Sequence, residues 1–291
     1  MKKIHGLTLF LFAWLNTVSF AYADGCDNPL QVSQVDYEPL PSRQIIIIID
    51  DLGHSLHRGK KAIELPGHIT YAVIPFTTHA QELADRAHMN GKEVMVHAPM
   101  STVQGDPLGV GGLTAHLSRR EFNERLNDAL DDVPHAQGIN NHMGSDLTQR
   151  RLQMGWLMQE LRWQELYFVD SRTSGRSVAA TVATEFNVPN LSREIFLDND
   201  LETEALARQF AEAVAYSKKH GRAVVIAHPH PETISYLQRA LPTLRDEGIA
   251  QLTVSQALKL ADREKDQMKT AGAQRVKLAA NKDVGAGAQG C

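Results

Sequence analysis

Short, uninterrupted apolar runs alternate along the chain with segments of helical period. The strongest run is five consecutive isoleucines at 45–49, which present no polar face to water and predict a strand buried on both sides. Shorter runs predict further strands at 69–74, 94–96, 137–139, 166–169, 224–227 and 252–254, with a weaker one between 188 and 197. Strands that alternate with helices in this way are typical of an α/β fold with a parallel sheet.

Several of the intervening segments carry helix-end signals. Thr78 with Gln81, and Ser118 with Glu121, have the spacing of a capping box and predict that helices begin there. Residues 202–220 have acids in their first turn and Lys-Lys-His in their last, followed by glycine, which matches the helix dipole. Seven or eight β-α units are therefore expected in one domain.

The two ends of the chain differ in composition from this central part. Two lysines, an apolar run and Ala-Tyr-Ala at 21–23 indicate a secretory signal peptide at 1–23, with a retained signal anchor as the alternative. Residues 24–43 are expected to be an extended lead-in, 44–260 the folded domain, and 261–291 a disordered tail. We therefore expect a periplasmic or secreted protein with no integral membrane segment after signal cleavage.

Composition narrows the classes of protein that fit. A hydrophobic content of 43% is enough for a full core, and a net charge of -4 with mixed signs argues against a nucleic-acid partner. The only cysteines, Cys26 and Cys291, fall in the expected tails, so neither a disulfide scaffold nor a cysteine zinc site is expected. The 13 histidines are the unusual count, because neutral imidazole is a common metal ligand.

Acidic and imidazole groups recur where the predicted strands stop. In a parallel β/α barrel all such ends share one rim, where active sites lie, whereas in an open sheet only those near the switch point converge. Five strand ends with polar groups therefore favour the barrel. These ends are Asp50-Asp51, His97, Asn140-Asn141-His142, Asp170-Ser171-Arg172 and His228-Pro229-His230.

Each of these groups also has a purely structural interpretation. Aspartates after a strand often cap the next helix, although two adjacent carboxylates beside a core require a cation or a proton. His97 alone would more often be a hydrogen-bonded core residue, and His142 an ordinary loop residue. His228 and His230 flank a proline, and one of the two can serve a site while the other is only its neighbour.

Hydrolysis at a divalent metal is the chemistry that uses such a set. One carboxylate and two imidazoles leave open positions for water, a second carboxylate can take the water's proton, and another histidine can protonate the leaving group. Other mechanisms fit less well. The chain has no Gly-x-Ser-x-Gly elbow, and the glycine run at 109–112 lacks the strand and Lys-Ser/Thr of a phosphate loop. The further carboxylates of a two-metal phosphoesterase are also not evident.

With these residues identified, the chain resembles the divergent polysaccharide deacetylase family over 44–257. The resemblance rests on Ile-Ile-Asp-Asp-Leu-Gly at 48–53, His-Ala-Pro-Met at 97–100, Asn-Asn-His-Met-Gly-Ser at 140–145, Phe-Val-Asp-Ser-Arg-Thr at 168–173 and His-Pro-His-Pro-Glu-Thr at 228–233. It implies an α/β fold of one domain, a distorted (β/α)7-8 barrel of the NodB type.

The resemblance also implies roles for individual residues. Asp50 would be the base, Asp51 and His142 metal ligands, and His228 the acid, with Arg172 where deacetylases carry an arginine that orients the base. Related deacetylases take two ligands from His-x-x-x-His, but here the fourth residue after His142 is Asp146. We therefore predict that His97 supplies the missing imidazole. The remaining rim residues, Asn141, Asp170 and His230, are predicted to bind substrate.

These assignments predict a metal-dependent hydrolase, with zinc the expected metal, that removes acetyl groups from an envelope polysaccharide or peptidoglycan-type glycan. The alternative is a catalytically weak or inactive barrel that acts as a glycan- or protein-binding envelope module, which the altered His-x-x-x-His motif would suit.

Overall fold

The computed structural model describes residues 41–285. The predicted signal peptide, nearly all of the lead-in and both cysteines lie outside these residues.

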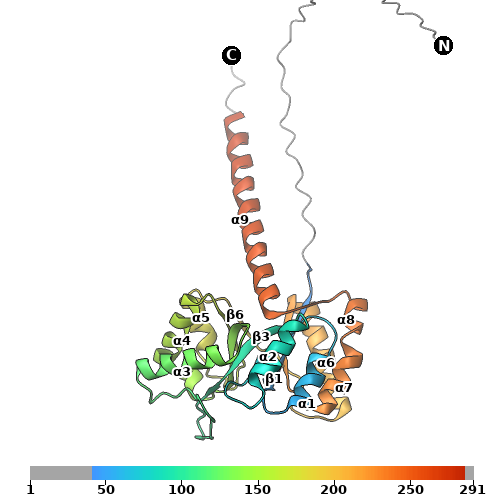
Figure 1. Cartoon of the computed structure of the whole chain (residues 1–291). Helices are drawn as coiled ribbons and strands as arrows, with labels where there is room; N and C mark the ends of the chain where they lie inside the picture. The colour runs from blue at the N-terminus through green and yellow to red at the C-terminus, as the bar shows by residue number, and fades with distance from the viewer. Residues whose placement is uncertain (1–40, 286–291) are drawn as a thin grey trace, which may run out of the picture. The chain divides into compact units, whose positions relative to one another are not determined.

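Nine parallel strands form one curled sheet at the centre of the domain (Figure 1). The spatial order is β6-β5-β4-β3-β2-β1-β8-β7, and β9 pairs with the first part of β1. Within the described chain the end strands β6 and β7 pair only with β5 and β8, so the sheet curls without closing into a ring. The strands are β1 Gln44–Leu52, β2 Ile69–Val73, β3 Glu93–Met100, β4 Ala136–Met143, β5 Tyr167–Asp170, β6 Asn190–Ser192, β7 Ile195–Phe196, β8 Arg222–Ala227 and β9 Ala250–Leu252.

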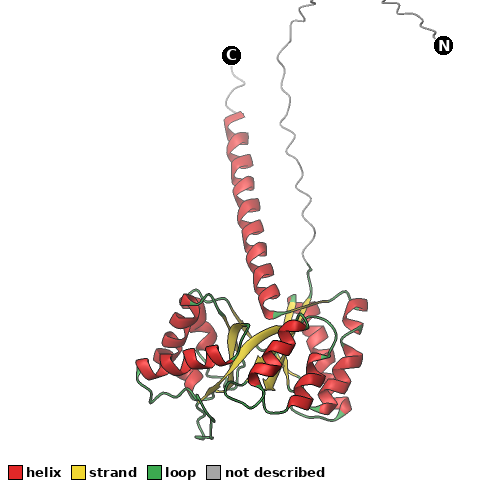
Figure 2. Cartoon of the chain, in the orientation of Figure 1, coloured by secondary structure: helices red, strands yellow, loops and turns green. Residues whose placement is uncertain are grey.

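Helices surround this sheet (Figure 2), which confirms the predicted distorted (β/α) barrel in one domain. The helices are α1 Leu56–Ile63, α2 Ala80–Met89, α3 Arg119–Asp132, α4 Arg151–Trp163, α5 Ala179–Glu185, α6 Thr203–His220, α7 Pro231–Ala240, α8 Thr243–Asp246 and α9 Val254–Gly285, with a 3-10 turn at Leu147–Gln149.

The two faces of the sheet bury different residues, because successive side chains of a strand point to opposite sides. Ile45, Ile47 and Ile49 pack in the larger core, against the surrounding helices. Ile46 and Ile48 belong to a second, smaller core on the inner face of the sheet. The five isoleucines of β1 therefore serve both cores, as their lack of a polar face predicts.

At the amino-terminal end of the strands, the inner face is closed by a buried carboxylate. Glu93 accepts hydrogen bonds from the hydroxyls of Thr70 (3.1 Å), Tyr167 (2.9 Å) and Thr253 (2.8 Å), and from the backbone and hydroxyl of Ser255. Because Ser255 lies in the first turn of α9, this carboxylate accepts from one of the amide groups that a helix start leaves free, and Thr70 accepts from the amide of Val254. The network fixes where α9 begins.

The structure differs from the expected tail at 261–291. Helix α9 continues through Gly285, and residues 286–291 lie outside the described chain. The segment lacks an apolar stripe, which suggested disorder, but it is rich in alanine, lysine, arginine and glutamine, all strong helix formers. A helix already started by the Glu93 network can extend through such residues without tertiary contacts, since propagation is easier than nucleation.

One predicted capping box is present and the other is not. Ser118 and Glu121 form the reciprocal bonds at the start of α3. The prediction for Thr78 and Gln81 was wrong: α2 begins after His79 without a side-chain cap, and Gln81 instead donates to a carboxylate of α3. Helix α6 ends at Gly221 with φ 85°, as its sequence predicts.

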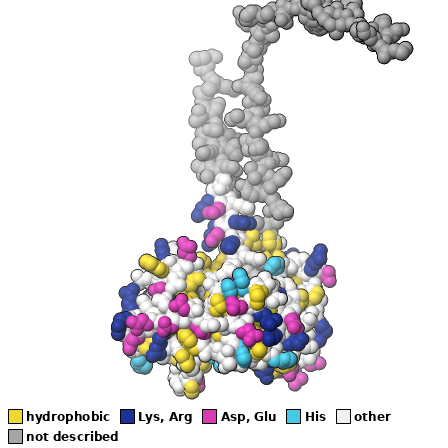
Figure 3. Space-filling view, in the orientation of Figure 1, with side chains coloured by type: hydrophobic (Ala, Val, Ile, Leu, Met, Phe, Trp, Pro, Cys, Tyr) yellow, Lys and Arg dark blue, Asp and Glu magenta, His cyan; other side chains and the backbone are white. Residues whose placement is uncertain are grey.

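Two further features concern the surface that Figure 3 shows and the described helices. Lysine, arginine and acidic side chains are interspersed on the face of the domain in Figure 3. Among the described helices, none combines the length and the hydropathy needed to cross a bilayer.

Candidate metal centre

Adjacent carboxylates at the end of β1 both face the site, although simple alternation would send them to opposite sides of the sheet. The pairing of β1 with β2 shifts register between Ile49 and Leu52, and Asp51 has a left-handed φ of 59°. This bulge-like irregularity turns Asp51 inward beside Asp50, which is 2% exposed. The two carboxylates that follow the five isoleucines therefore lie together on the inner face of the sheet.

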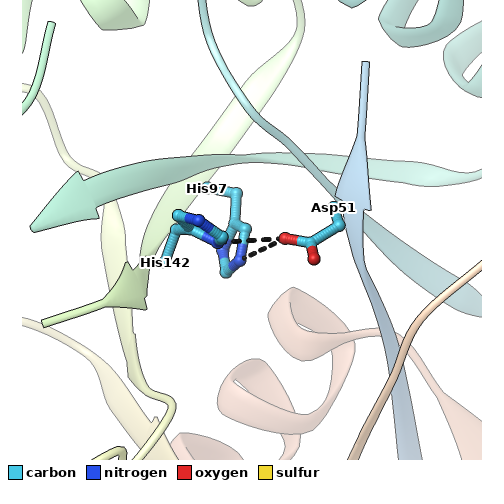
Figure 4. Close-up of side chains that lie close together, drawn as sticks. All are labelled: Asp51, His97 and His142. Carbon is cyan, nitrogen blue, oxygen red and sulfur yellow. Dashed lines mark ion pairs between the residues drawn. The ribbon is translucent and has the colours of Figure 1, made fainter. Parts of the chain in front are cut away.

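Asp51, His97 and His142 meet at the carboxyl ends of β1, β3 and β4 (Figure 4). The Oδ1 atom of Asp51 lies 3.0 Å from His142 Nδ1 and 3.2 Å from His97 Nε2. That oxygen is buried and accepts no hydrogen bond from any described residue. One oxygen without a partner and two imidazole nitrogens therefore point at a common position.

This donor set fits a divalent cation. The three ligand atoms lie within 4.8 Å of one another, and a tetrahedral zinc ion with bonds of roughly 2.0–2.1 Å spaces its ligands by about 3.3 Å. Burial would raise the pKa of Asp51, but its contacts with His142 and His97 outweigh burial and hold that pKa well below its usual range. The carboxylates therefore require a positive charge, which a metal ion or a protonated imidazole supplies.

Asn140 joins this group to the second carboxylate. Its Oδ1 lies 2.7 Å from His97 Nδ1, and its Nδ2 donates to Asp50 Oδ1 at 2.8 Å. Because Asn140 Nδ2 is engaged with Asp50, Asn140 Oδ1 accepts from His97 Nδ1, and Nε2 is the ring nitrogen left for a metal. Burial opposes the charged ring, but Asp50 and Asp51 raise the pKa of His97, so a metal would bind Nε2 by displacing a proton. The sequence pattern marks Asn140 only as part of a polar segment and predicts no role for it. Its side chain is fully buried and lies on the inner face, next to Asp50.

Asp50 has the environment of a base. Burial raises its pKa above the ordinary value, although the nearby His97 and His228 oppose that shift. Its Oδ2 lies 3.6 Å from His97 Nε2 and outside direct hydrogen-bonding distance, so one carboxylate oxygen stays available to a water. A carboxylate in this position can accept a proton at neutral pH.

His228 lies across the site and is held by Asp198, a residue that we did not identify from the sequence. Asp198 Oδ1 is 3.0 Å from His228 Nδ1, and Asp198 Oδ2 accepts from the His228 backbone N–H at 2.6 Å and from Thr233 at 2.9 Å. Burial disfavours the charged ring, but the bond to Asp198 and the charges of Asp50 and Asp51 raise the pKa of His228 to about 9. The ring is therefore protonated at neutral pH, with Nε2 facing the site 3.8 Å from Asp51.

Asp198 directly follows the weak strand predicted between 188 and 197, so the rule that located the other site residues could have located it. Asp198, His228 and His230 also lie close enough to share an ion. We interpret them as a positioning group instead, because the oxygens of Asp198 already accept three hydrogen bonds.

Three sequence-predicted residues make contacts outside this group. Arg172 is exposed with φ 51°, and among the described residues it makes no hydrogen bond or ion pair with Asp50, so the expected orienting contact is not formed. Asn141 donates to the backbone of Met143 and accepts from Ser171 N. Asp170 accepts from Arg172 N and from the hydroxyl of Ser177.

These bonds order the loop after β5 rather than presenting Asn141 and Asp170 to a ligand, because alternation along β4 places the Asn141 side chain on the face opposite Asn140. His230, by contrast, lines a cavity of about 200 Å³ that includes Asp51 and His228.

The fold is a (β/α) barrel, and its site consists of one carboxylate and two imidazoles at the rim. Asp50 and His228 lie beside these three groups. Residues 47–258 match the model of the family described as divergent polysaccharide deacetylase, and the chain belongs to that family.

Relatives with similar sequences include an uncharacterized protein of Haemophilus influenzae, 39% identical over 70% of this chain and 73% of the relative. The uncharacterized protein YibQ of Escherichia coli is 35% identical over 71% of this chain and 65% of its own length. The chain thus spans slightly less than two thirds of YibQ.

Similar folds occur in solved structures. An uncharacterized protein of Agrobacterium tumefaciens matches with a TM-score of 0.72 at 20% identity, covering 76% of this chain and 91% of that one. A variant of the peptidoglycan deacetylase PdaC of Bacillus subtilis matches with a TM-score of 0.50 at 12% identity, covering 79% and 96%. At these identities the likeness concerns the fold.

Proposed function

We propose that this protein is a metal-dependent hydrolase that removes N- or O-acetyl groups from an envelope glycan, such as a peptidoglycan-type polysaccharide. The observation that carries the proposal is the buried Oδ1 of Asp51, which has no hydrogen-bond partner among the described residues and faces His97 and His142. The deacetylase family supplies the substrate class. The predicted signal peptide at 1–23 would place the protein in the periplasm or outside the cell, where such glycans occur.

Asp51, His97 and His142 would hold the cation, and zinc suits one carboxylate with two imidazoles. When bound, such an ion polarises the acetyl carbonyl and makes water a better nucleophile. Asp50, buried and fixed by Asn140, accepts the proton of the attacking water. His228, kept protonated beside Asp198, donates a proton to the departing amine or alkoxide.

The geometry favours this activity over a purely binding role. The motif change at position 146 removes one expected imidazole, but His97 brings another to within 3.2 Å of Asp51. Asp146 itself accepts from Ser101 at 2.9 Å and pairs with Arg150 at 2.7 Å, away from the three donor atoms. This arrangement supports the proposal, because His97 of β3 would take the place of the imidazole that the motif lacks.

The test uses the chain without residues 1–23, loaded with zinc and incubated with a panel of acetylated glycans. Acetate release is expected for the wild type. Asp50→Asn should retain the metal and lose turnover. Asp51→Ala should lose both, because of the two aspartates only Asp51 is grouped with His97 and His142 as a metal ligand. A fully metallated wild type that releases no acetate from any glycan of the panel would refute the proposal and favour the binding module.

A further inference from the structure

A groove lies between α1 and α7, next to the cavity at the metal centre. It has a volume of about 360 Å³, and the two helices are in contact along it. Arg58 lines both this groove and the cavity of about 200 Å³ that contains Asp51 and His228. The groove and the catalytic rim are therefore neighbours that share one arginine.

The groove is cationic on its sides and apolar on its floor. Arg58 and Lys61 of α1 and Arg239 of α7 are exposed along its sides, while Ile234 is buried beneath them. None of its lining residues is acidic. This differs from the net charge of the chain, which is -4.

The two arginines are available to a ligand. Within the described chain neither Arg58 nor Arg239 forms an ion pair, and Arg239 donates only to the hydroxyl of Ser235, at 2.9 Å. Lys61 is different, because it already pairs with Glu64 at 2.9 Å. Guanidinium groups bind carboxylates and phosphates with paired, planar hydrogen bonds, so two unpaired arginines over one groove select for an anion.

The direction of α1 and α7 adds to the positive charge at the groove. Ser55 and His230, the residues at which α1 and α7 begin, both line the cavity beside the metal centre. The positive ends of both helix dipoles therefore face the junction between cavity and groove. Among residues 41–285, the side chain of His230 makes no capping bond to the first turn of α7.

We infer that this groove binds an anionic substituent, a carboxylate or a phosphate, carried by the glycan whose acetyl group lies at the metal centre. This inference rests on the proposed function for the position of the acetylated sugar. The anion at Arg58 and Arg239 would anchor a neighbouring sugar, so that the protein acts on acidic rather than neutral glycans.

The experiment measures binding and turnover separately, with the zinc-loaded chain. Fluorescently labelled N-acetylglucosamine tetrasaccharides are titrated in three forms: neutral, carrying a lactyl carboxylate, and carrying a phosphate. Anisotropy gives the Kd of each, and acetate release is measured on the same oligomers. We compare the wild type with Arg58→Gln, Arg239→Gln and the double variant. Lys60→Gln is the matched control, because Lys60 lies on the same helix but pairs with Glu82 of α2 at 3.1 Å.

We expect the anionic oligomers to bind more tightly than the neutral one at low salt. Each arginine substitution should weaken their binding by about fivefold, the upper end for an exposed charge pair. Binding of the neutral oligomer should not change, and Lys60→Gln should bind all three like the wild type. A preference for only one anion would identify the source of the charge.

No preference for anionic oligomers, or a preference that persists in the double variant, would overturn the inference even if acetate is released. Conversely, an arginine-dependent preference without acetate release would leave the groove in place and refute the proposed function.

Discussion

Asn140 connects the metal ligand His97 to the base Asp50, and its removal should affect both metal binding and catalysis. Asn140→Ala deletes the bond to His97 Nδ1 (2.7 Å) and the bond to Asp50 Oδ1 (2.8 Å). Hydrogen bonds to charged groups contribute about 1.5–3 kcal/mol each. Since both partners are at most 3% exposed, water cannot readily replace the lost bonds, and we expect the protein to lose roughly 3 kcal/mol of unfolding free energy.

Metal affinity should fall as well, because a ligating histidine depends on the group that fixes its other nitrogen. Loss of such a partner typically costs roughly 10–100-fold in metal affinity. The assay is competition for zinc against a chelator, with the free energy of unfolding measured by urea denaturation. Asn140→Asp separates the two roles. It still accepts from His97, but it places a second carboxylate against Asp50 that shares a proton with it, so it should recover metal binding without recovering turnover.

Thr253→Val is the matched control for the two Asn140 variants. Thr253 is also buried, and it donates to Glu93 at 2.8 Å at the opposite end of the strands. Its loss should lower stability and leave the zinc Kd unchanged. If Asn140→Ala bound zinc as tightly as the wild type, His97 would not be a ligand oriented by Asn140, and the reasoning would be refuted.

Three further predictions concern other parts of the domain. Asp198→Asn removes the charge that helps to raise the pKa of His228 to about 9. The alkaline limb of the plot of kcat against pH should therefore move toward neutral pH, and an unchanged limb would exclude His228 as the acid. Gly53→Ala should lower the unfolding free energy by more than about 2 kcal/mol, because Gly53 has a φ of 127° and the added carbon would lie 2.0 Å from the Thr77 hydroxyl. Thermal denaturation measures this loss, and a loss below about 1 kcal/mol would contradict the prediction. Glu93→Ala should lower the unfolding free energy by about 3 kcal/mol or more, and it should speed hydrogen exchange at the start of α9. If the Ser255 amide kept its protection from exchange, the Glu93 network would not be what holds the start of α9.

The sequence predicted which strand ends would meet because a parallel barrel brings all of them to one rim. That rule does not say where a side chain points. Asn141 and Asp170 lie at the ends of β4 and β5, yet their polar groups bond to loop residues, and the Arg172 side chain is exposed. The direction of each depends on alternation along a strand and on local backbone geometry.

Other features depend on contacts that no local pattern records. Asp198 and His228 are thirty residues apart and meet only because β7 pairs with β8. The inward turn of Asp51 depends on a register shift between β1 and β2. Helix α9 extends beyond the predicted domain because the distant Glu93 fixes its first turn. Sequence periodicity describes elements, whereas these contacts arise from their pairing.

The central claim is that His97 replaces the imidazole expected at position 146. Metal analysis of the purified chain after equilibration with zinc tests it directly, with His97→Ala compared against Asp146→Ala. The wild type and Asp146→Ala should each bind one ion per chain, because Asp146 is engaged with Ser101 and Arg150, and His97→Ala should retain little. Full zinc occupancy in His97→Ala, or loss of zinc in Asp146→Ala, would contradict the proposed metal centre.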